Sequence, residues 1–305
     1  MKLTYLPFLV ASVAAIGELG FNIGTKNNDG TCKDANAYTS DLNRIKGYAS
    51  SVKIFSTSDC NTLQILGPVA DNAGVGIHVG VWPTPDDKWE TEKQALTEYL
   101  PKISKSSVKA FLVGSEALYR GDLTGDELAS KITELKTFLE GIKDKNGNSY
   151  GGSPVTFVDS WNKYQDGTAN PAIAVSDAFY VNAFSFWQGI AQDNSSYSFY
   201  DDIMQALQII QTAKGSTDLP FYVGETGWPT KGANFGSAVP GVSAAADYYQ
   251  KAICSIRALG VNVIQFEYED EVWKPVTSDT DEVENNWGAW DSNNNLKYPL
   301  NCKFT

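Results

Sequence analysis

The sequence predicts a single (β/α)8 barrel, an α/β fold in which eight parallel strands alternate with helices. Short runs of β-branched and aromatic residues recur eight times, and amphipathic stretches follow most of them. No linker or change of composition divides the 305 residues, a length that suits one large barrel. The predicted strands are 19–24, 52–56, 75–82, 108–113, 155–159, 178–184, 221–224 and 261–266.

Helices are predicted between these strands from apolar spacing and from end signals. The clearest one follows Thr124, which forms a capping-box pair with Glu127, and it stops at Asn146-Gly147. Residues 61–73 are a weaker helix because a Gly-Pro pair interrupts them. The other predicted helices cover 86–100, 200–212 and 243–259.

An open, doubly wound sheet is the alternative for the same alternation of strands and helices. A dinucleotide-binding sheet of that kind needs G-x-G-x-x-G after its first strand. Residues 21–26 read Phe-Asn-Ile-Gly-Thr-Lys and do not provide it. The barrel is therefore the preferred fold.

Composition limits the classes of partner and cofactor. With 24 Lys and Arg against 36 Asp and Glu, the net charge is −12, which argues against nucleic acid or an anionic membrane as partner. The 8 Trp, 15 Tyr and 14 Phe residues suit a carbohydrate binder, because sugars lie flat on rings. A site with two histidines is excluded, since His78 is alone, and we expect it to be a core residue of its strand. No motif indicates a metal or an organic cofactor, so we expect none, and no pattern indicates an oligomeric state.

Residues 1–15 are predicted to be a signal peptide, and residues 16–305 to be the barrel domain. Lys2 precedes a short apolar run that ends in small residues. The run is too short to span a bilayer, and Pro7 would break a helix there, which argues against a buried first element. We therefore expect a secreted protein that is not bound to a membrane.

Secretion would place four cysteines in an oxidising compartment, where an even number indicates two disulfides with three possible pairings. Position along the chain favours Cys32 with Cys60, in the loops after the first two strands. It also favours Cys254, on the last long helix, with Cys302 near the terminus. The single N-x-S/T sequon predicts one N-linked glycan at Asn194.

Two glutamates end predicted strands in similar contexts. Glu116 follows Val113-Gly114-Ser115, and Glu225 follows Val223-Gly224. In a barrel, the carboxyl ends of the strands form the mouth that carries the active site. Glycoside cleavage needs one carboxylic acid to protonate the leaving oxygen and one carboxylate at the anomeric carbon. Either glutamate alone is equally well a surface residue, but the pair predicts catalysis by Glu116 and Glu225.

The strings around these residues resemble glycoside hydrolase family 17. Residues 219–232 match the family's signature around its nucleophile, and the chain is most similar to the secreted fungal cell-wall 1,3-β-glucanosyltransferases of the Bgl2 type. The resemblance covers essentially the whole mature chain. It implies that Glu225 is the nucleophile and Glu116 the general acid/base of a retaining reaction on β-1,3-glucan in the fungal cell wall. The other similar strings are 16–19, 26–32, 113–120, 198–207 and 286–290.

Eight further residues are expected to contact the glucan. Some follow from the resemblance: the wider family has an Asn that bonds the sugar 2-hydroxyl where this chain has Ser115, and a substrate-contacting Glu and Lys at Glu271 and Lys274. The others lie at strand ends, where rings stack on sugars and polar groups bond their edges. As alternatives, each Trp fills space between barrel and helices, and Lys274 forms a plain salt bridge. The predicted contacts are Ser115, Tyr119, Asp159, Trp161, Asn182, Trp187, Glu271 and Lys274.

Three functions fit these residues. The first is a 1,3-β-glucanosyltransferase with endo-1,3-β-glucanase activity, which the subgroup resemblance favours. The second is a mainly hydrolytic endo-1,3-β-glucanase, because the two glutamates serve either acceptor. The third is a non-catalytic glucan-binding protein of the wall, against which the intact pair of glutamates argues.

Overall fold

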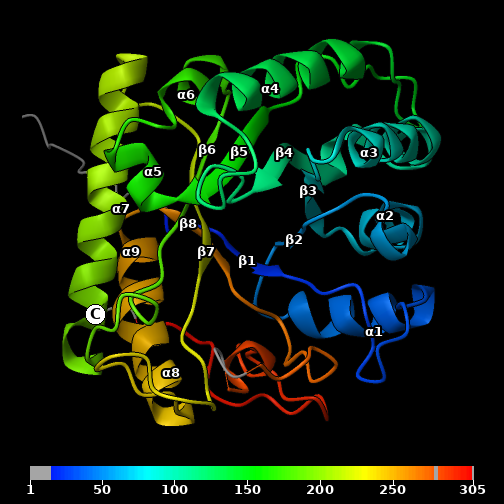
Figure 1. The fold of residues 1–305 in the computed structure, drawn as a ribbon. Helices are drawn as coiled ribbons and strands as arrows, with labels where there is room; N and C mark the ends of the chain where they lie inside the picture. Colours follow the sequence, from blue (N-terminus) through cyan, green and yellow to red (C-terminus); the bar gives the residue numbers. More distant parts are fainter. Residues whose placement is uncertain (1–14, 278–280, 304–305) are drawn as a thin grey trace, which may run out of the picture.

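The computed structural model describes residues 15–277 and 281–303. Eight strands form a closed barrel in chain order, each pair is parallel, and β8 pairs with β1 (Figure 1). This architecture confirms the predicted (β/α)8 fold. Residues 1–14 of the predicted signal peptide lie outside the described residues. The strands are β1 (Leu19–Asn22), β2 (Ser51–Ile54), β3 (Gly76–Val81), β4 (Val108–Ser115), β5 (Val155–Ser160), β6 (Phe179–Asn182), β7 (Phe221–Thr226) and β8 (Asn262–Gln265).

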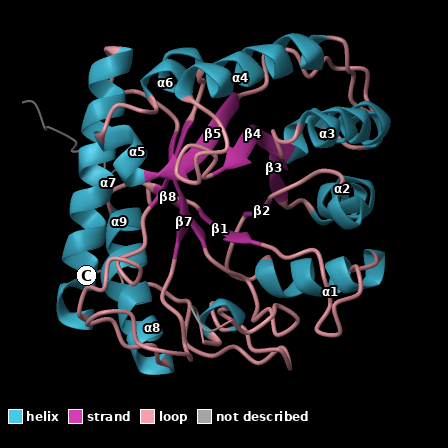
Figure 2. Cartoon of the chain, in the orientation of Figure 1, coloured by secondary structure: helices cyan, strands magenta, loops and turns pink. Residues whose placement is uncertain are grey.

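The helices form a layer around the barrel (Figure 2). The longer helices are α1 (Ala35–Ile45), α2 (Thr62–Ala73), α3 (Asp86–Tyr99), α4 (Gly125–Glu140) and α7 (Gln192–Lys214). The shorter ones are α5 (Trp161–Gln165), α6 (Asn170–Val175), α8 (Val242–Tyr248) and α9 (Ser255–Ala258), with a π-helical segment Tyr249–Cys254 between the last two. The 3-10 turns are Asp59–Asn61, Leu100–Lys102, Lys105–Ser107 and Val283–Asn285.

The predicted helices differ from the observed ones mainly at their ends. The capping box before α4 is confirmed, because the side chains of Thr124 and Glu127 each accept a hydrogen bond from the other's backbone N–H. Helix α7 begins eight residues before the predicted start at 200. The stretch between the two starts is mostly polar, although it contains the buried Phe199. The predicted helix 243–259 consists of α8, the π-helical segment and α9. Helix α1 was not predicted.

The core has two parts, one between the strands and the helices and a smaller one inside the barrel. His78 of β3 lies fully buried in the interior, and its ring nitrogens contact the hydroxyls of Tyr180 at 2.8 Å and Ser51 at 3.1 Å. Burial lowers the pKa of His78 to about 3. The prediction of a core histidine is confirmed, and the interior of the barrel is a packed polar and aromatic layer.

Both predicted disulfides are confirmed. Cys32–Cys60 joins the loops that follow β1 and β2, and Cys254–Cys302 ties the C-terminal segment to the π-helical segment. A search of the helices within residues 15–277 and 281–303 finds none that is long and apolar enough to cross a membrane.

Candidate active site

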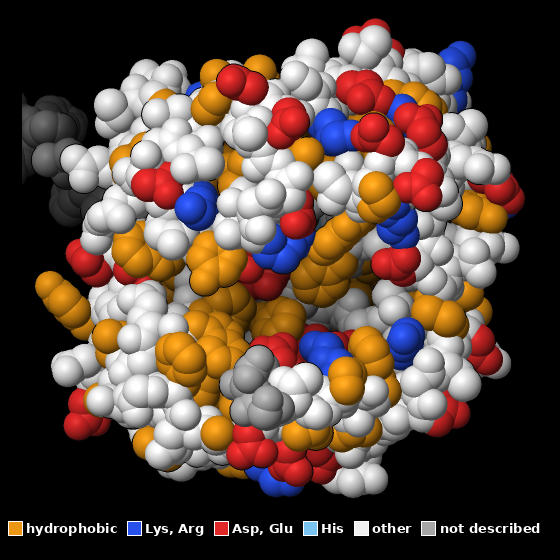
Figure 3. Space-filling model, viewed as in Figure 1, with side chains coloured by type: hydrophobic (Ala, Val, Ile, Leu, Met, Phe, Trp, Pro, Cys, Tyr) orange, Lys and Arg blue, Asp and Glu red, His pale blue; other side chains and the backbone are white. Residues whose placement is uncertain are grey.

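Glu116 and Glu225 lie in one cleft at the carboxyl end of the barrel. Glu116 directly follows β4 and is half-buried, whereas Glu225 lies near the end of β7 and is 7% exposed. In the space-filling view, the hollow over the barrel is bordered by hydrophobic and acidic side chains (Figure 3). The cleft has a volume of about 520 Å³ and is lined by Glu116, Tyr119, Ser160, Trp161, Asn162, Phe184, Trp187, Gln188, Glu225, Phe235, Phe266 and Glu284.

A tight turn of the backbone sets the direction of Glu116. Gly114 has φ 75° and Glu116 itself has φ 58°, a left-handed conformation that is unusual for a residue with a side chain. The next residues are held from β5, because the Asp159 carboxylate accepts the N–H groups of Leu118 at 2.8 Å and Tyr119 at 3.1 Å. Strain at such a position persists only where the surroundings hold it, so Asp159 holds the loop of Glu116 in place.

The carboxylate of Glu225 is clamped through one oxygen. Its Oε1 accepts hydrogen bonds from Lys53 Nζ at 2.5 Å and from Ser115 Oγ at 2.8 Å. Among the described residues, no hydrogen bond is formed to its Oε2. The preceding residue must be glycine, because a Cβ on Gly224 would lie 2.5 Å from a methyl carbon of Val158. The protein thus engages one carboxylate oxygen of Glu225 and leaves the second for a substrate.

Glu116 and Glu225 have environments that separate their protonation states. Burial, followed by the charge of Glu225, raises the pKa of Glu116 to about 7. Asn182 of β6 acts in the opposite direction by donating to Glu116 Oε1 at 3.0 Å. A protonated carboxyl beside an ionised one is the arrangement that lets two like groups act as acid and as nucleophile.

Three of the predicted aromatic contacts line the cleft. Tyr119 is 55% exposed, and Trp161 and Trp187 are half-buried against the same wall. Phe235, which the sequence analysis did not select, extends this wall, since its ring packs edge-on against Trp187 with centroids 5.2 Å apart. These four rings line the same cleft as Glu116, and together they are named the aromatic wall.

The other predicted contacts are engaged with the protein itself. Asp159 and Asn182 are fully buried and bond the Glu116 loop and the Glu116 carboxyl, respectively, and Ser115 bonds Glu225. Glu271 and Lys274 form an ion pair at 2.6 Å and are not among the residues that line the cleft. The arrangement of Lys274 therefore fits the alternative of a salt bridge.

The sequence analysis missed two charged residues of the site. Lys53 could have been noticed in the sequence, because a lysine in the middle of an apolar strand must point to a buried partner or to solvent. Glu284 lies in the loop after β8 and lines the cleft, and burial raises its pKa. No local pattern could have placed that loop residue beside residues of β4 and β7. Among the described residues, no group of three or more His, Cys, Asp and Glu side chains is arranged to hold a metal ion.

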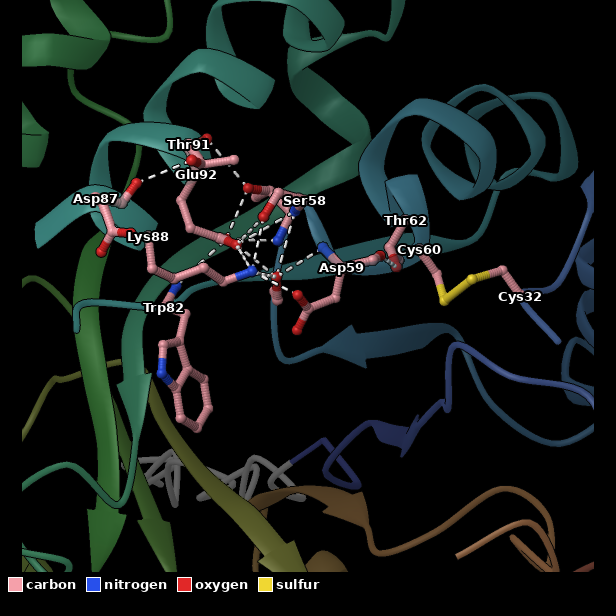
Figure 4. Close-up of polar contacts among 12 residues, drawn as sticks. Cys32, Ser58, Asp59, Cys60, Thr62, Trp82, Asp87, Lys88, Thr91 and Glu92 are labelled. Atoms are coloured by element: carbon pink, nitrogen blue, oxygen red, sulfur yellow. Dashed lines mark hydrogen bonds and ion pairs between the residues drawn. A yellow bond between two sulfur atoms is a disulfide. The ribbon is translucent and has the colours of Figure 1, made fainter. Parts of the chain in front are cut away.

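A buried carboxylate supports the loop after β2 and the end of β3, beside the cleft. The Glu92 carboxylate of α3 accepts hydrogen bonds from Ser58 Oγ at 2.6 Å and from the backbone N–H of Trp82 at 3.3 Å (Figure 4). Lys88 lies 3.0 Å from the same carboxylate. The guanidinium of Arg120, in the Glu116 loop, lies over the Trp82 ring at 4.8 Å. The loops after β2 and β3 thus support the loop that carries Glu116, through the contact of Trp82 with Arg120.

A family model for glycosyl hydrolases family 17 matches residues 19–302. The chain belongs to this family. It is therefore a glycoside hydrolase, and the family resemblance seen in its motifs is confirmed.

Relatives in this family span nearly the whole chain. A glucan 1,3-beta-glucosidase, BGL2, of Candida albicans is 56% identical over 302 residues, covering 99% of this chain and 98% of that protein. The glucan 1,3-beta-glucosidase of Saccharomyces cerevisiae is 55% identical, covering 99% and 96%. Among solved structures, the family 17 beta-1,3-glucanosyltransferase of Rhizomucor miehei has a TM-score of 0.79 and 25% identity, covering 93% of this chain and 98% of that one. An active-site mutant of that enzyme, in complex with laminaritriose, also has a TM-score of 0.79, and covers 94% and 98%.

Proposed function

We propose that the protein is a retaining 1,3-β-glucanosyltransferase of β-1,3-glucan that also has endo-1,3-β-glucanase activity. The observation that carries this proposal is the pair of glutamates in one cleft, with Glu116 protonated near neutral pH and Glu225 held by Lys53 and Ser115. The names of the fungal relatives and of the Rhizomucor enzyme support β-1,3-glucan as the substrate class.

The first half-reaction uses the two glutamates in opposite roles. The free Oε2 of Glu225 attacks the anomeric carbon and forms a carbon–oxygen bond. The glycosidic bond breaks, and the leaving oxygen takes the proton of Glu116. The products are a glycosyl ester on Glu225, an ionised Glu116 and a shortened glucan that leaves from the side of Glu116.

The second half-reaction reverses the proton transfer. Glu116, now a base, removes the proton from the hydroxyl of an acceptor, whose oxygen attacks the anomeric carbon and releases the carboxylate of Glu225. A glucan acceptor gives transfer, whereas water gives hydrolysis. The aromatic wall of Tyr119, Trp161, Trp187 and Phe235 lines the cleft of Glu116 and supports transfer, because it offers rings on which an acceptor glucan can stack.

The proposed place of action is the fungal cell wall, reached by secretion after removal of residues 1–15. The fungal origin of the relatives supports this location. Asn194 lies exposed at the first turn of α7, which suits the predicted N-linked glycan. Treatment of the secreted protein with an endoglycosidase should lower its mass by one glycan, and Asn194→Gln should abolish that change.

Incubation with laminari-oligosaccharides tests the reaction. Products longer than the substrate are expected, with shorter products beside them, and chromatography separates the two. If all products are shorter than the substrate, the protein acts only as a hydrolase and the proposed transfer is refuted.

Glu225→Gln tests the assignment of the nucleophile. This variant should lose turnover and keep oligosaccharide binding, measured by calorimetry. Glu90→Gln, a change on the exposed side of α3, is the matched control and should keep wild-type activity. Undiminished turnover in Glu225→Gln would refute the assignment and would indicate that a residue other than Glu225 is the nucleophile.

A further inference from the structure

The side chain of Lys53 is 1% exposed, and β2 directs it into the barrel interior, where its Nζ lies 2.5 Å from Glu225 Oε1. The ring of Phe55 covers the ammonium at 4.5 Å. Burying an ammonium costs free energy unless the charge is paired. The contact with Glu225 therefore offsets the cost of burying Lys53 under the nucleophile.

Few other charged or titratable groups face Lys53. From β4, Ser115 shares its acceptor oxygen and Glu116 interacts with it electrostatically. On the neighbouring strands, Lys53 pairs with Asn22 of β1 and His78 of β3, of which only the histidine can titrate. His78 is neutral at working pH because burial lowers its pKa to about 3.

From the β8 side, Glu284 interacts electrostatically with Glu225. Burial lowers the pKa of Lys53, and the charges of Glu225 and Glu116 oppose that effect. The ammonium therefore depends on both catalytic glutamates for its charge.

The charge balance of the reaction follows from these neighbours and rests on the proposed function. In the free enzyme, Lys53 is positive, Glu225 negative and Glu116 protonated. In the glycosyl-enzyme, Glu225 is a neutral ester and Glu116 has become negative by giving up its proton. The three groups together stay neutral in both states, although the negative charge has moved from one glutamate to the other.

We infer that Lys53 is a positioning residue that serves as the constant countercharge of both half-reactions, paired with Glu225 before ester formation and with Glu116 after it. In the first state it orients Glu225 through Oε1 and leaves Oε2 to attack. In the second state it stabilises the ionised Glu116 that must act as base. Its charge thus favours the nucleophile and then the base without moving a proton itself.

The pH dependence of kcat/KM on laminari-oligosaccharides tests this role with Lys53→Met. Lys53→Met removes a positive charge from a site where charge develops during the reaction, so kcat/KM should fall by about 100-fold or more. The basic limb of the bell, which reports Glu116, should move to higher pH, because the charge of Lys53 lowers the pKa of Glu116 and its removal favours the protonated form. A lowered kcat/KM with an unmoved basic limb would show a merely structural role and overturn the inference, as would activity close to wild type.

The matched control is Lys33→Met. Lys33 is another buried lysine, 3% exposed, and it pairs with Asp41 at 2.8 Å and with Glu269 away from the cleft. This variant should lose stability to a similar degree and keep the basic limb at its wild-type pH. A basic limb that moves equally in both variants would overturn the inference.

A double-mutant cycle tests the pair without any substrate. Lys53→Met leaves Glu225 buried and unpaired, whereas Lys53→Met with Glu225→Gln leaves no unpaired charge. We expect at least tenfold coupling in the unfolding equilibrium constant, and recovery of folding in the double variant if Lys53→Met alone does not fold. Additive effects would overturn the inference. A wild-type protein that is inactive on the oligosaccharides would instead refute the proposed function, and the cycle would still decide whether Lys53 and Glu225 are coupled.

Discussion

The clamp on Glu225 leads to a quantitative prediction for Ser115→Ala. This change removes one of the two donors to Glu225 Oε1, a hydrogen bond of 2.8 Å to an ionised group. Hydrogen bonds to charged groups contribute about 1.5–3 kcal/mol, so kcat/KM should fall by about 13- to 160-fold.

The assay is the initial rate on laminari-oligosaccharides between pH 3 and pH 9, with far-UV circular dichroism to confirm folding. Ser160→Ala is the control, since Ser160 lines the cleft but, among the described residues, forms no hydrogen bond with either glutamate. It should stay within threefold of the wild type. The explanation of the clamp is wrong if Ser115→Ala also stays within threefold of the wild type.

Three more predictions follow from burial and cross-linking. Since the pKa of Glu116 is raised to about 7 and the acid form donates the proton, kcat/KM should fall as the pH rises through about 7, and a rate that is flat to pH 9 would refute this. Removing the Cys254–Cys302 disulfide, which spans 48 residues, should cost about 4 kcal/mol and lower the Tm by about 6 °C in calorimetry; an unchanged Tm would contradict it. Because burial lowers the pKa of His78 from its ordinary value of 6.5 to about 3 on folding, the protein should lose up to about 5 kcal/mol of stability as the pH drops from 6.5 to 3, and His78→Gln should lose less in urea unfolding; equal losses would exclude His78 as the cause.

Local patterns predicted the fold well, because strand and helix periodicity depends on neighbours in the chain. All eight strands were expected, and the apolar stripe with its capping box marked α4. The ends of helices were less predictable. Helix α7 extends through a polar stretch in which Phe199 is buried against Tyr248 of α8, and α1 was not predicted. Tertiary packing overrides local preference at such ends.

The two glutamates were recognisable from their places after strands four and seven, since a barrel collects every strand end at one mouth. The roles of their neighbours were not. Ser115 and Asn182 were expected to touch sugar, yet they bond Glu225 and Glu116, respectively. Lys53 is 172 residues from Glu225 in the chain, and no pattern links the two.

Residue types and their order thus sufficed for the barrel, both disulfide pairings and the pair of acids, because each depends on periodicity or on strand order. The protonation states and the clamp arise from contacts between distant strands. Charge interactions depend on distance and on exclusion of water, and both exist only once the chain has closed around Glu116 and Glu225.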